Sequence, residues 1–304
     1  MASSKTNRRH ILITGPHRSG TTWVGRTISQ NENIELVYEP FNPDFIRYNF
    51  TYKFDYWVEH TPTSPRKKNI EKVFDQYIPK SFVDYPVKIC RESGFSYKSP
   101  VIFLKYLYLS QKMPRYLLKD PIALLSAGWL YERYDLQVIC MIRKPLSFAG
   151  SLKVLNWDFD FSNFLEQEKL METQLEPFKE KMVQVYHHGD FIDRISLLWN
   201  VLNTVILQYM QAYPEWLFVR QEDVAMKPTK QFRKIFQYLN LPFDESIKQY
   251  IRKFTSRKNP VEAESSSYQP RDSKKTLETW RERLTIEEAE RISAATEKVY
   301  KQLY

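Results

Sequence analysis

The residues best suited to chemistry stand in a glycine-containing turn, "GPHRSGTTW", at 15–23. The apolar run "ILIT" precedes this turn, so we expect a strand before it and a helix after it. Such a unit directs backbone N–H groups and the positive end of a helix dipole at one point, which suits a phosphate. A nucleoside triphosphate loop has a lysine after its second glycine, but this chain has Thr21 there. Arg18 instead offers a guanidinium that can hold a phosphate through two hydrogen bonds.

Three features together resemble one enzyme family: the pattern "GxxRSGTTW", the run "MIRKPLSFAGS" at 141–151 and the sequence "KDP" at 119–121. They resemble the sulfotransferases that use 3′-phosphoadenosine-5′-phosphosulfate (PAPS) as sulfuryl donor. The resemblance implies that the turn holds the 5′-phosphate of the donor. The residues that it assigns to this role are Arg18, Ser19, Gly20, Thr21 and Thr22. Trp23 resembles a tryptophan that stacks on adenine in some members.

The family binds the 3′-phosphate of its donor with an arginine at a strand end and a serine about eight residues later. Arg143 and Ser151 stand at that spacing, and the apolar run before Arg143 would place it at the carboxyl edge of a sheet, where open α/β sheets bind ligands. Many members have "RDPR" or "RDGR" at this point, whereas this chain has "RKPL". Lys144 therefore replaces an acid and the second arginine is lost, so the resemblance does not indicate which residues support Arg143.

Sulfuryl transfer to a hydroxyl needs a base for the hydroxyl proton and cations for the developing negative charge. Glu39, in "VYEPFNP", follows closely on the first strand and helix. Resemblance to tyrosyl-protein and carbohydrate sulfotransferases implies that Glu39 is the base and that Lys119 bridges donor and acceptor oxygens, with Arg18 as a further catalytic cation. The cytosolic small-molecule enzymes instead use a histidine close after the lysine. This chain has none there, so Asp120 stays an alternative base.

A polar, turn-rich stretch at 255–279 precedes Trp280 and interrupts the regular pattern. Long irregular segments inside a domain are often functional loops. The resemblance implies a loop that covers the donor, with Ser265 and Ser266 near the sulfuryl or 5′-phosphate group and Arg271 and Lys274 near the 3′-phosphate. A loop without donor contacts is the alternative. The acid in "VRQEDV" (219–224) resembles a structural acid of the family and is left out of the site.

These residues need elements that bring them together. Apolar runs of strand type alternate with segments of helical period, which predicts an α/β fold with a central parallel sheet of about five strands and helices on both faces. The runs are at 10–14, 116–119, 136–143 and 216–220. The clearest helix is 191–209, and a last helix should begin at Thr285, with Glu288 completing a capping box.

The chain of 304 residues, 42% of them apolar, is expected to form one domain over 1–304, a sulfotransferase domain by the resemblance. Within it we expect a flexible leader at 1–9 and an acceptor-side insertion at 44–115. No run approaches the ~20 apolar residues of a membrane span, and the leader lacks a signal-peptide core. Cys90 and Cys140 fit a cytoplasmic location, and the histidines and acids show no zinc spacing, so no metal is expected.

A net charge of +9 favours an anionic ligand without choosing among nucleotides, polyanions, membranes and nucleic acid. We favour a hydroxyl-bearing acceptor, such as a carbohydrate, glycolipid or small molecule, and no nucleic-acid partner. Two other functions remain: a small-molecule kinase, against which Thr21 argues, and a non-catalytic binder of nucleotides or acidic polysaccharide. Aromatic residues of 44–115 and 156–190 suit either an acceptor pocket or a core. They are Tyr48, Phe54, Tyr56, Trp57, Trp157 and Phe159.

Overall fold

The computed structural model of the protein describes residues 9–42, 115–262 and 268–304. In these ranges five parallel strands form one sheet in the order β2-β3-β1-β4-β5. The strands are β1 (Ile11–Thr14), β2 (Ile34–Tyr38), β3 (Arg115–Lys119), β4 (Gln137–Ile142) and β5 (Leu217–Arg220). The predicted parallel α/β sheet is confirmed. The apolar runs had indicated four of these strands, and β2 is the fifth.

The middle strand β1 shows why the sheet forms a double-sided core. All four of its residues are buried, and β3 and β4 pair with it on either side. Successive side chains of a strand point to opposite faces. Ile11 and Ile13 accordingly pack into one apolar cluster, whereas Leu12 packs into the other. A continuous apolar run of this kind is typical of a parallel strand covered on both faces.

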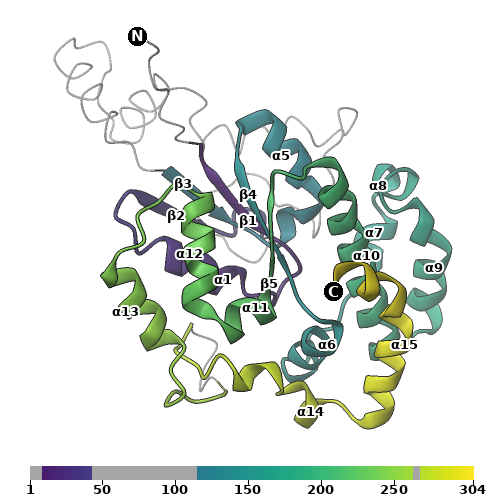
Figure 1. The fold of residues 1–304 in the computed structure, drawn as a ribbon. Helices are drawn as coiled ribbons and strands as arrows, with labels where there is room; N and C mark the ends of the chain where they lie inside the picture. The colour runs from purple at the N-terminus through teal and green to yellow at the C-terminus, as the bar shows by residue number, and fades with distance from the viewer. Residues whose placement is uncertain (1–8, 43–114, 263–267) are drawn as a thin grey trace, which may run out of the picture.

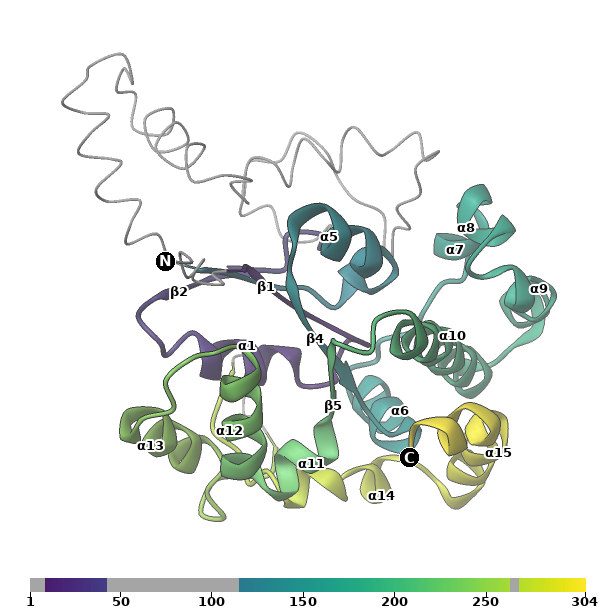
Figure 2. The ribbon, with the colours of Figure 1, turned by 45° about the horizontal axis from the view of Figure 1, so that its top comes forward.

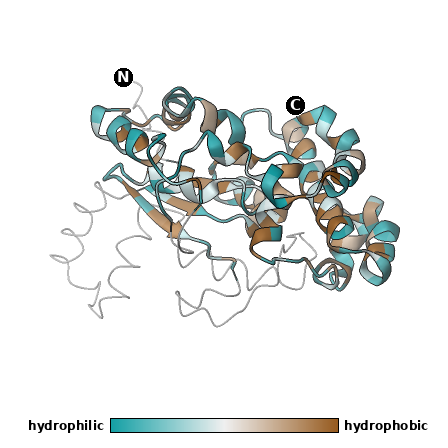
Figure 3. Ribbon diagram, turned by 90° about the horizontal axis from the view of Figure 1, so that it is seen from below, coloured by the Kyte–Doolittle hydropathy of each residue, from teal (hydrophilic) through white to brown (hydrophobic). Residues whose placement is uncertain are grey.

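Four helices cover the face of Ile11 and Ile13, as Figure 2 shows. They are α1 (Thr21–Ile28), α11 (Gln221–Met226), α12 (Pro228–Tyr238) and α13 (Glu245–Phe254). Figure 3 shows hydrophilic and hydrophobic residues alternating along the surrounding helices, as expected when one side of a helix packs on a sheet and the other meets water. Phe232 of α12 is fully buried against this face.

The other face carries α10 (Phe191–Ala212), which matches the helix predicted over 191–209 (Figure 1). An Asp190–Asp193 capping box begins it, and residues along its length are buried in the Leu12 cluster. The remaining elements on this side and in the C-terminal stretch are η2 (Ile122–Ser126), α5 (Ala127–Tyr134), α6 (Pro145–Val154), α7 (Ser162–Leu165), α8 (Glu168–Glu172), η3 (Glu176–Phe178), α9 (Lys179–His188), η4 (Lys275–Leu277), α14 (Trp280–Arg283) and α15 (Ile286–Leu303).

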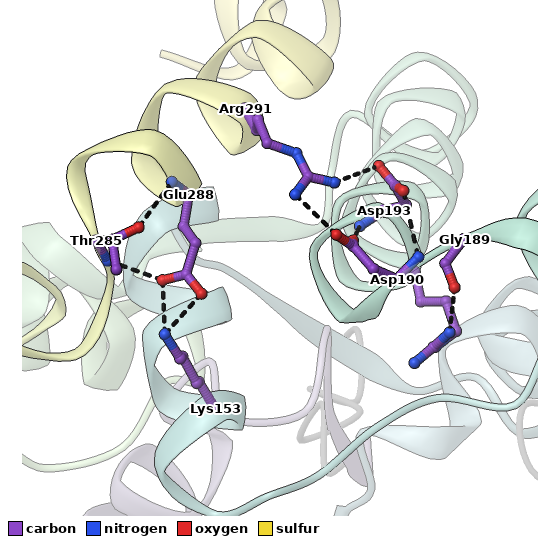
Figure 4. Close-up of polar contacts among 8 residues, drawn as sticks. Lys153, Gly189, Asp190, Asp193, Thr285, Glu288 and Arg291 are labelled. Atoms are coloured by element: carbon purple, nitrogen blue, oxygen red, sulfur yellow. Dashed lines mark hydrogen bonds and ion pairs between the residues drawn. The ribbon is translucent and has the colours of Figure 1, made fainter.

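The last helix, α15, packs against α6 and α10 and is held there by ion pairs. The predicted capping box is present, because Thr285 Oγ1 accepts from the Glu288 N–H and the Glu288 side chain accepts from the Thr285 N–H. Glu288 also holds Lys153 of α6 at 2.6 Å, and Arg291 pairs with both acids of the α10 capping box (Figure 4). These contacts fix the C-terminal helix beside α6.

Several expectations fall outside the described residues. These are the leader at 1–9, except Arg9, and the insertion at 44–115, except Arg115. Cys90 and the aromatic residues Tyr48, Phe54, Tyr56 and Trp57 belong to this insertion and also lie outside the described residues. Among the helices that the structure describes, none has both the length and the apolar character needed to cross a bilayer. Cys140 is a free thiol buried in β4, and this burial raises its pKa.

Candidate active site

The residues singled out by the sequence converge on one edge of the sheet. Because all five strands are parallel, their carboxyl ends lie at the same edge. The glycine turn follows β1, Glu39 follows β2, Asp120 follows β3 and Arg143 follows β4. Segments that are as far apart in sequence as 15–23 and 141–151 therefore face one another.

The turn after β1 depends on two glycines. Gly15 has φ 132°, and a Cβ there would stand 2.3 Å from the Met141 carbonyl oxygen of β4. Gly20 has φ 89° and is the N-cap of α1, with no side chain of the described residues capping the helix. The chain thus enters α1 with its first N–H groups uncapped by side chains, as an anion site at a helix N-terminus requires.

Polar atoms inside the turn lack partners in the described part of the chain. Ser19 is fully buried, and its Oγ has no hydrogen-bond partner there, nor does Thr14 Oγ1 at the end of β1. Buried hydroxyls are normally satisfied, so unpaired ones at the mouth of a turn mark a place for an acceptor or donor from a ligand. Thr21 is buried as well, and Thr22 Oγ1 lies 3.5 Å from Tyr38 Oη.

Arg18 joins the turn to the predicted 3′-phosphate residues. Its Nε donates a 3.0 Å hydrogen bond to Ser151 Oγ of α6, 133 residues further along the chain. Nη1 of Arg143 donates to the Arg18 carbonyl, whereas Arg143 Nε is buried without a partner among the described residues. Arg18 itself has φ 64°, in the left-handed region that non-glycine residues rarely adopt. The two predicted phosphate sites are therefore adjacent and share Arg18.

Backbone contacts fix the position of Arg143. Trp199 Nε1 of α10 donates a 2.8 Å bond to its carbonyl oxygen. The next N–H, that of Lys144, donates at 2.8 Å to Glu222, which in turn accepts from Tyr304 Oη at 2.9 Å. Pro145 then begins α6 at its first position, where a missing N–H costs nothing. Glu222, the acid of "VRQEDV", thus supports the strand end, as expected, without entering the turn.

Four guanidinium groups gather around this point. Burial, followed by repulsion from Arg271 and Arg283, lowers the pKa of Arg18. Burial and the charge of Arg18 lower the pKa of Arg143 to about 10, with Arg283 contributing. Arg271 is half-buried and has its pKa lowered by burial and by Arg283. Such a gathering of like charges is costly unless an anion joins it.

Glu39 and Lys119 form an ion pair at the ends of β2 and β3. The register places Tyr38 opposite Lys119, and the Glu39 N–H donates at 2.8 Å to the Lys119 carbonyl, so the two side chains start from adjacent points. Asn42 Nδ2 donates at 2.7 Å to the other Glu39 oxygen. Lys119 Nζ lies 3.7 Å from the centre of the Tyr38 ring. Gly25 of α1 leaves room for the lysine stem, since a Cβ at this position would stand 3.2 Å from Lys119 Cγ.

Asp120 is placed differently from Glu39. It is fully buried, and its carboxylate oxygens accept from the N–H groups of Phe41 at 2.6 Å and Ile122 at 2.9 Å. Burial first, and then the charge of Glu39, raise its pKa to about 7, while the two N–H donors act against this rise. These contacts hold the segment after β2 against the start of η2.

The other predicted residues are distributed as follows. Trp23 lies edge-on to Phe232 with ring centres 5.5 Å apart, and its Nε1 has no partner among the described residues. Lys274 is exposed, and its backbone N–H donates to the Asp272 side chain. Ser265 and Ser266 lie outside the described residues, so the donor-covering role of 255–279 stays a prediction.

Sequence reasoning missed three residues of this site. Tyr38 lies under the Lys119 ammonium, Asn42 holds Glu39, and Arg283 stands among the arginines. The first two closely flank Glu39 in "VYEPFN", so their proximity was a usable signal. Nothing in the sequence marks Arg283, because α14 reaches the site only by packing on α6. Within the described ranges, no group of three or more His, Cys, Asp or Glu residues is arranged to hold a metal ion.

The chain matches the family model for the sulfotransferase domain over residues 8–304. Carbohydrate sulfotransferase 1 of Danio rerio is 19% identical over 326 residues, covering 93% of this chain and 74% of that protein. Carbohydrate sulfotransferase 3 of Homo sapiens is 20% identical over 341 residues, covering 95% of this chain. The chain spans 65% of the length of this human relative.

Solved structures similar to this chain include the sulfotransferase domain from the curacin biosynthetic pathway. It is 16% identical, covers 94% of this chain and 96% of its own, and superposes with a TM-score of 0.47. A mouse sulfotransferase complexed with PAP is 12% identical, covers 95% of this chain and 82% of its own, and has a TM-score of 0.41. Because the family model covers nearly the entire chain, the protein belongs to the sulfotransferase domain family.

Proposed function

We propose that this protein transfers the sulfuryl group of PAPS to a hydroxyl of a carbohydrate, glycolipid or small-molecule acceptor. One observation carries the proposal: the glycine turn and the Arg143–Ser151 pair are joined through Arg18, beside the Glu39–Lys119 ion pair. A nucleotide with phosphates at both its 3′ and 5′ positions needs two neighbouring anion sites, and a group transfer needs a base and a cation next to them.

The donor would lie along the carboxyl edge of the sheet. The turn and the start of α1 suit its 5′-phosphosulfate, because the buried Ser19 hydroxyl has no partner among the described residues and no side chain there caps the N-terminus of α1. Arg143 and Ser151 suit the 3′-phosphate. Arg143 Nε has no hydrogen-bond partner among the described residues, so it can donate to this phosphate. Arg18 lies where it can reach either anion.

The reaction is a displacement at sulfur. The acceptor oxygen attacks, a new oxygen–sulfur bond forms, and the bond from sulfur to the 5′-phosphate oxygen breaks, leaving adenosine 3′,5′-bisphosphate. Glu39 takes the hydroxyl proton, and Lys119 stabilises negative charge on the transferring group and on the leaving phosphate. The ion pair keeps the carboxylate and the ammonium within reach of the same point. Asp120 is buried and fully engaged with backbone N–H groups, so we assign it to structure.

A carbohydrate acceptor is favoured because two relatives carry the name carbohydrate sulfotransferase. One aromatic of the expected acceptor walls stands beside the turn. Trp157 is 49% exposed, and its ring centre lies 5.7 Å from the Arg18 guanidinium carbon. An exposed indole next to the donor site offers a flat apolar surface of the kind that packs on sugar rings. Phe159, by contrast, is buried in the core.

The test is thermal melting with adenosine 3′,5′-bisphosphate and, separately, with ATP and Mg²⁺. Selective stabilisation by the bisphosphate, worth about 2.7 kcal/mol at ~100 times its Kd, supports the donor assignment. Stabilisation by ATP with Mg²⁺ alone would favour a kinase. A labelled product formed from PAPS and an extract of the source cells would identify the acceptor, whereas binding without any product would favour a non-catalytic nucleotide-binding protein.

A further inference from the structure

Arg283 belongs to the short helix α14, which packs directly on the helix that carries Ser151. A Cβ added at Gly150 of α6 would stand 3.1 Å from the Cα of Trp280 and 3.6 Å from the Cβ of Arg283. Figures 1 and 2 both show α14 lying beside α6. Gly150 directly precedes Ser151, so the base of the Arg283 side chain lies one helix position away from a predicted 3′-phosphate residue.

The Arg283 side chain is largely withdrawn from solvent and held by an acid. It is 13% exposed and pairs with Glu262, whose side chain is 56% exposed. An arginine so nearly buried needs an anionic partner, whereas the exposed glutamate is already largely hydrated and loses little stabilisation when it leaves the pair. The pair therefore joins a nearly buried cation to a carboxylate that can readily dissociate and become fully hydrated.

The Arg283 guanidinium lies near three other guanidinium groups, those of Arg18, Arg143 and Arg271. Arg283 repels Arg18, Arg143 and Arg271, and it contributes to the lowered pKa of each. Glu262 offsets part of this repulsion for Arg18 and Arg271, and Glu222 offsets part of it for Arg143. The buried Nε of Arg143 is also a donor without a hydrogen-bond partner in the described ranges. A phosphate monoester, with about two negative charges at neutral pH, would satisfy several of these donors at once.

We propose that Arg283 is a third guanidinium of the 3′-phosphate site and that Glu262 occupies it until a 3′-phosphorylated nucleotide takes its place. This inference rests on the proposed donor and specifies how the chain selects it. Binding exchanges one ion pair for another, so the phosphate gains Arg283 and the Glu262 carboxylate returns to water. A nucleotide without a 3′-phosphate leaves the Arg283–Glu262 pair intact.

The experiment compares adenosine 3′,5′-bisphosphate with adenosine 5′-phosphate by isothermal titration calorimetry. Arg283→Ala should lower the affinity for the bisphosphate by roughly 10- to 100-fold, which is the effect expected from losing a hydrogen bond to a charged group. It should change the affinity for the monophosphate by less than about twofold, since that ligand does not reach Arg283. Arg281→Ala is the matched control, because Arg281 lies on the same helix, is 65% exposed and pairs with Glu278. It should leave both affinities unchanged.

Glu262→Gln gives an independent test in the opposite direction. Removing the competing carboxylate should tighten bisphosphate binding by several-fold and leave the monophosphate unaffected. This variant keeps the proposal testable if Arg283→Ala fails to fold, which its melting curve would reveal. Weaker bisphosphate binding by Glu262→Gln, or an equal loss of both nucleotides in Arg283→Ala, would overturn the role of Arg283.

The wild-type titration separates this proposal from the proposed donor. A wild-type protein that binds the two nucleotides equally well, or binds neither, overturns the donor assignment and this inference together. A wild-type protein that prefers the bisphosphate, with an unchanged preference in Arg283→Ala, overturns only the role of Arg283.

Discussion

The N–H of Glu39 donates a 2.8 Å hydrogen bond to the carbonyl of Lys119, and the side chains of the same two residues form an ion pair. The backbone bond continues the ladder between β2 and β3 by one step beyond Tyr38. Sheet pairing thus decides which carboxylate meets the lysine. Asp120, the next residue after Lys119, points into the protein instead and accepts from the N–H of Phe41.

Glu39→Gln should lower kcat by about 100-fold or more, because an amide cannot take the acceptor proton. Affinity for adenosine 3′,5′-bisphosphate should stay within about twofold of wild type, since Glu39 faces Lys119 and Asn42 and not the arginines. Turnover with PAPS and calorimetry with the bisphosphate measure the two quantities. Glu35→Gln is the control, because Glu35 is an exposed acid on the same strand. Full turnover by Glu39→Gln would move the base assignment to another residue.

Arg143→Ala should lower the affinity for adenosine 3′,5′-bisphosphate by roughly 10- to 100-fold, because it removes a charged hydrogen-bond donor at the end of β4. Lys144→Ala, at the neighbouring exposed cation, should change this affinity little. The readout is again calorimetry, with ATP as a second ligand. An equal loss of ATP and bisphosphate affinity in Arg143→Ala would count against a 3′-phosphate role.

Arg18→Ala and Ser151→Ala should be coupled in their effects on bisphosphate binding. Their side chains share a 3.0 Å hydrogen bond, and residues in direct contact usually show interaction energies of at least about 0.5 kcal/mol. A double-mutant cycle of bisphosphate affinities measures this. Strict additivity would show that the two residues act at separate places.

His17→Gln should make the protein less sensitive to acid. Burial, followed by the charges of Arg18 and Arg143, lowers the pKa of His17 from 6.5 to about 3. Below pH 6.5, His17 is therefore protonated in the unfolded chain but stays neutral in the folded protein. The free energy of unfolding falls as the pH drops below 6.5, by up to about 2 kcal/mol at about pH 5. Urea unfolding at neutral pH and at about pH 5 measures the difference between wild type and variant.

The other titrations are common to both proteins in that comparison. Asp120 acts with the opposite sign, because its pKa is raised to about 7 and its stabilisation is lost as pH rises through that value. His187→Gln is the control, since His187 is exposed on α9. If wild type and His17→Gln lost the same stability on acidification, His17 would not be the group responsible.

Gly15→Ala should lower the free energy of unfolding by about 3 kcal/mol or more, because a Cβ would collide with the Met141 carbonyl and φ 132° is strained for alanine. Gly20→Ala should cost only about 1–2 kcal/mol. Its φ of 89° is also unfavourable, but the nearest atom to a new Cβ is Gln221 Cγ at 3.3 Å. Denaturant unfolding gives both values, and equal costs would contradict the steric explanation for Gly15.

The sequence by itself determined the parallel sheet, the helices at 191–209 and after Thr285, and the turn at 15–23. Apolar runs, helical periods and capping residues are local patterns, so they can be read without knowing how the chain returns on itself. Strand β2 was not predicted as a strand, because the exposed Glu35 interrupts its apolar run. The many aromatic residues at 44–115 form no periodic pattern that could place them.

Only the tertiary structure decided which of these residues meet. The register of β2 against β3 brings Glu39 to Lys119, and the packing of α14 on α6 brings Arg283 beside Gly150, the residue before Ser151. Arg18 and Ser151 are 133 residues apart, and no spacing rule links them. The physical reason is that charge and hydrogen-bonding partners are selected by distance in space, which depends on every strand and helix between them.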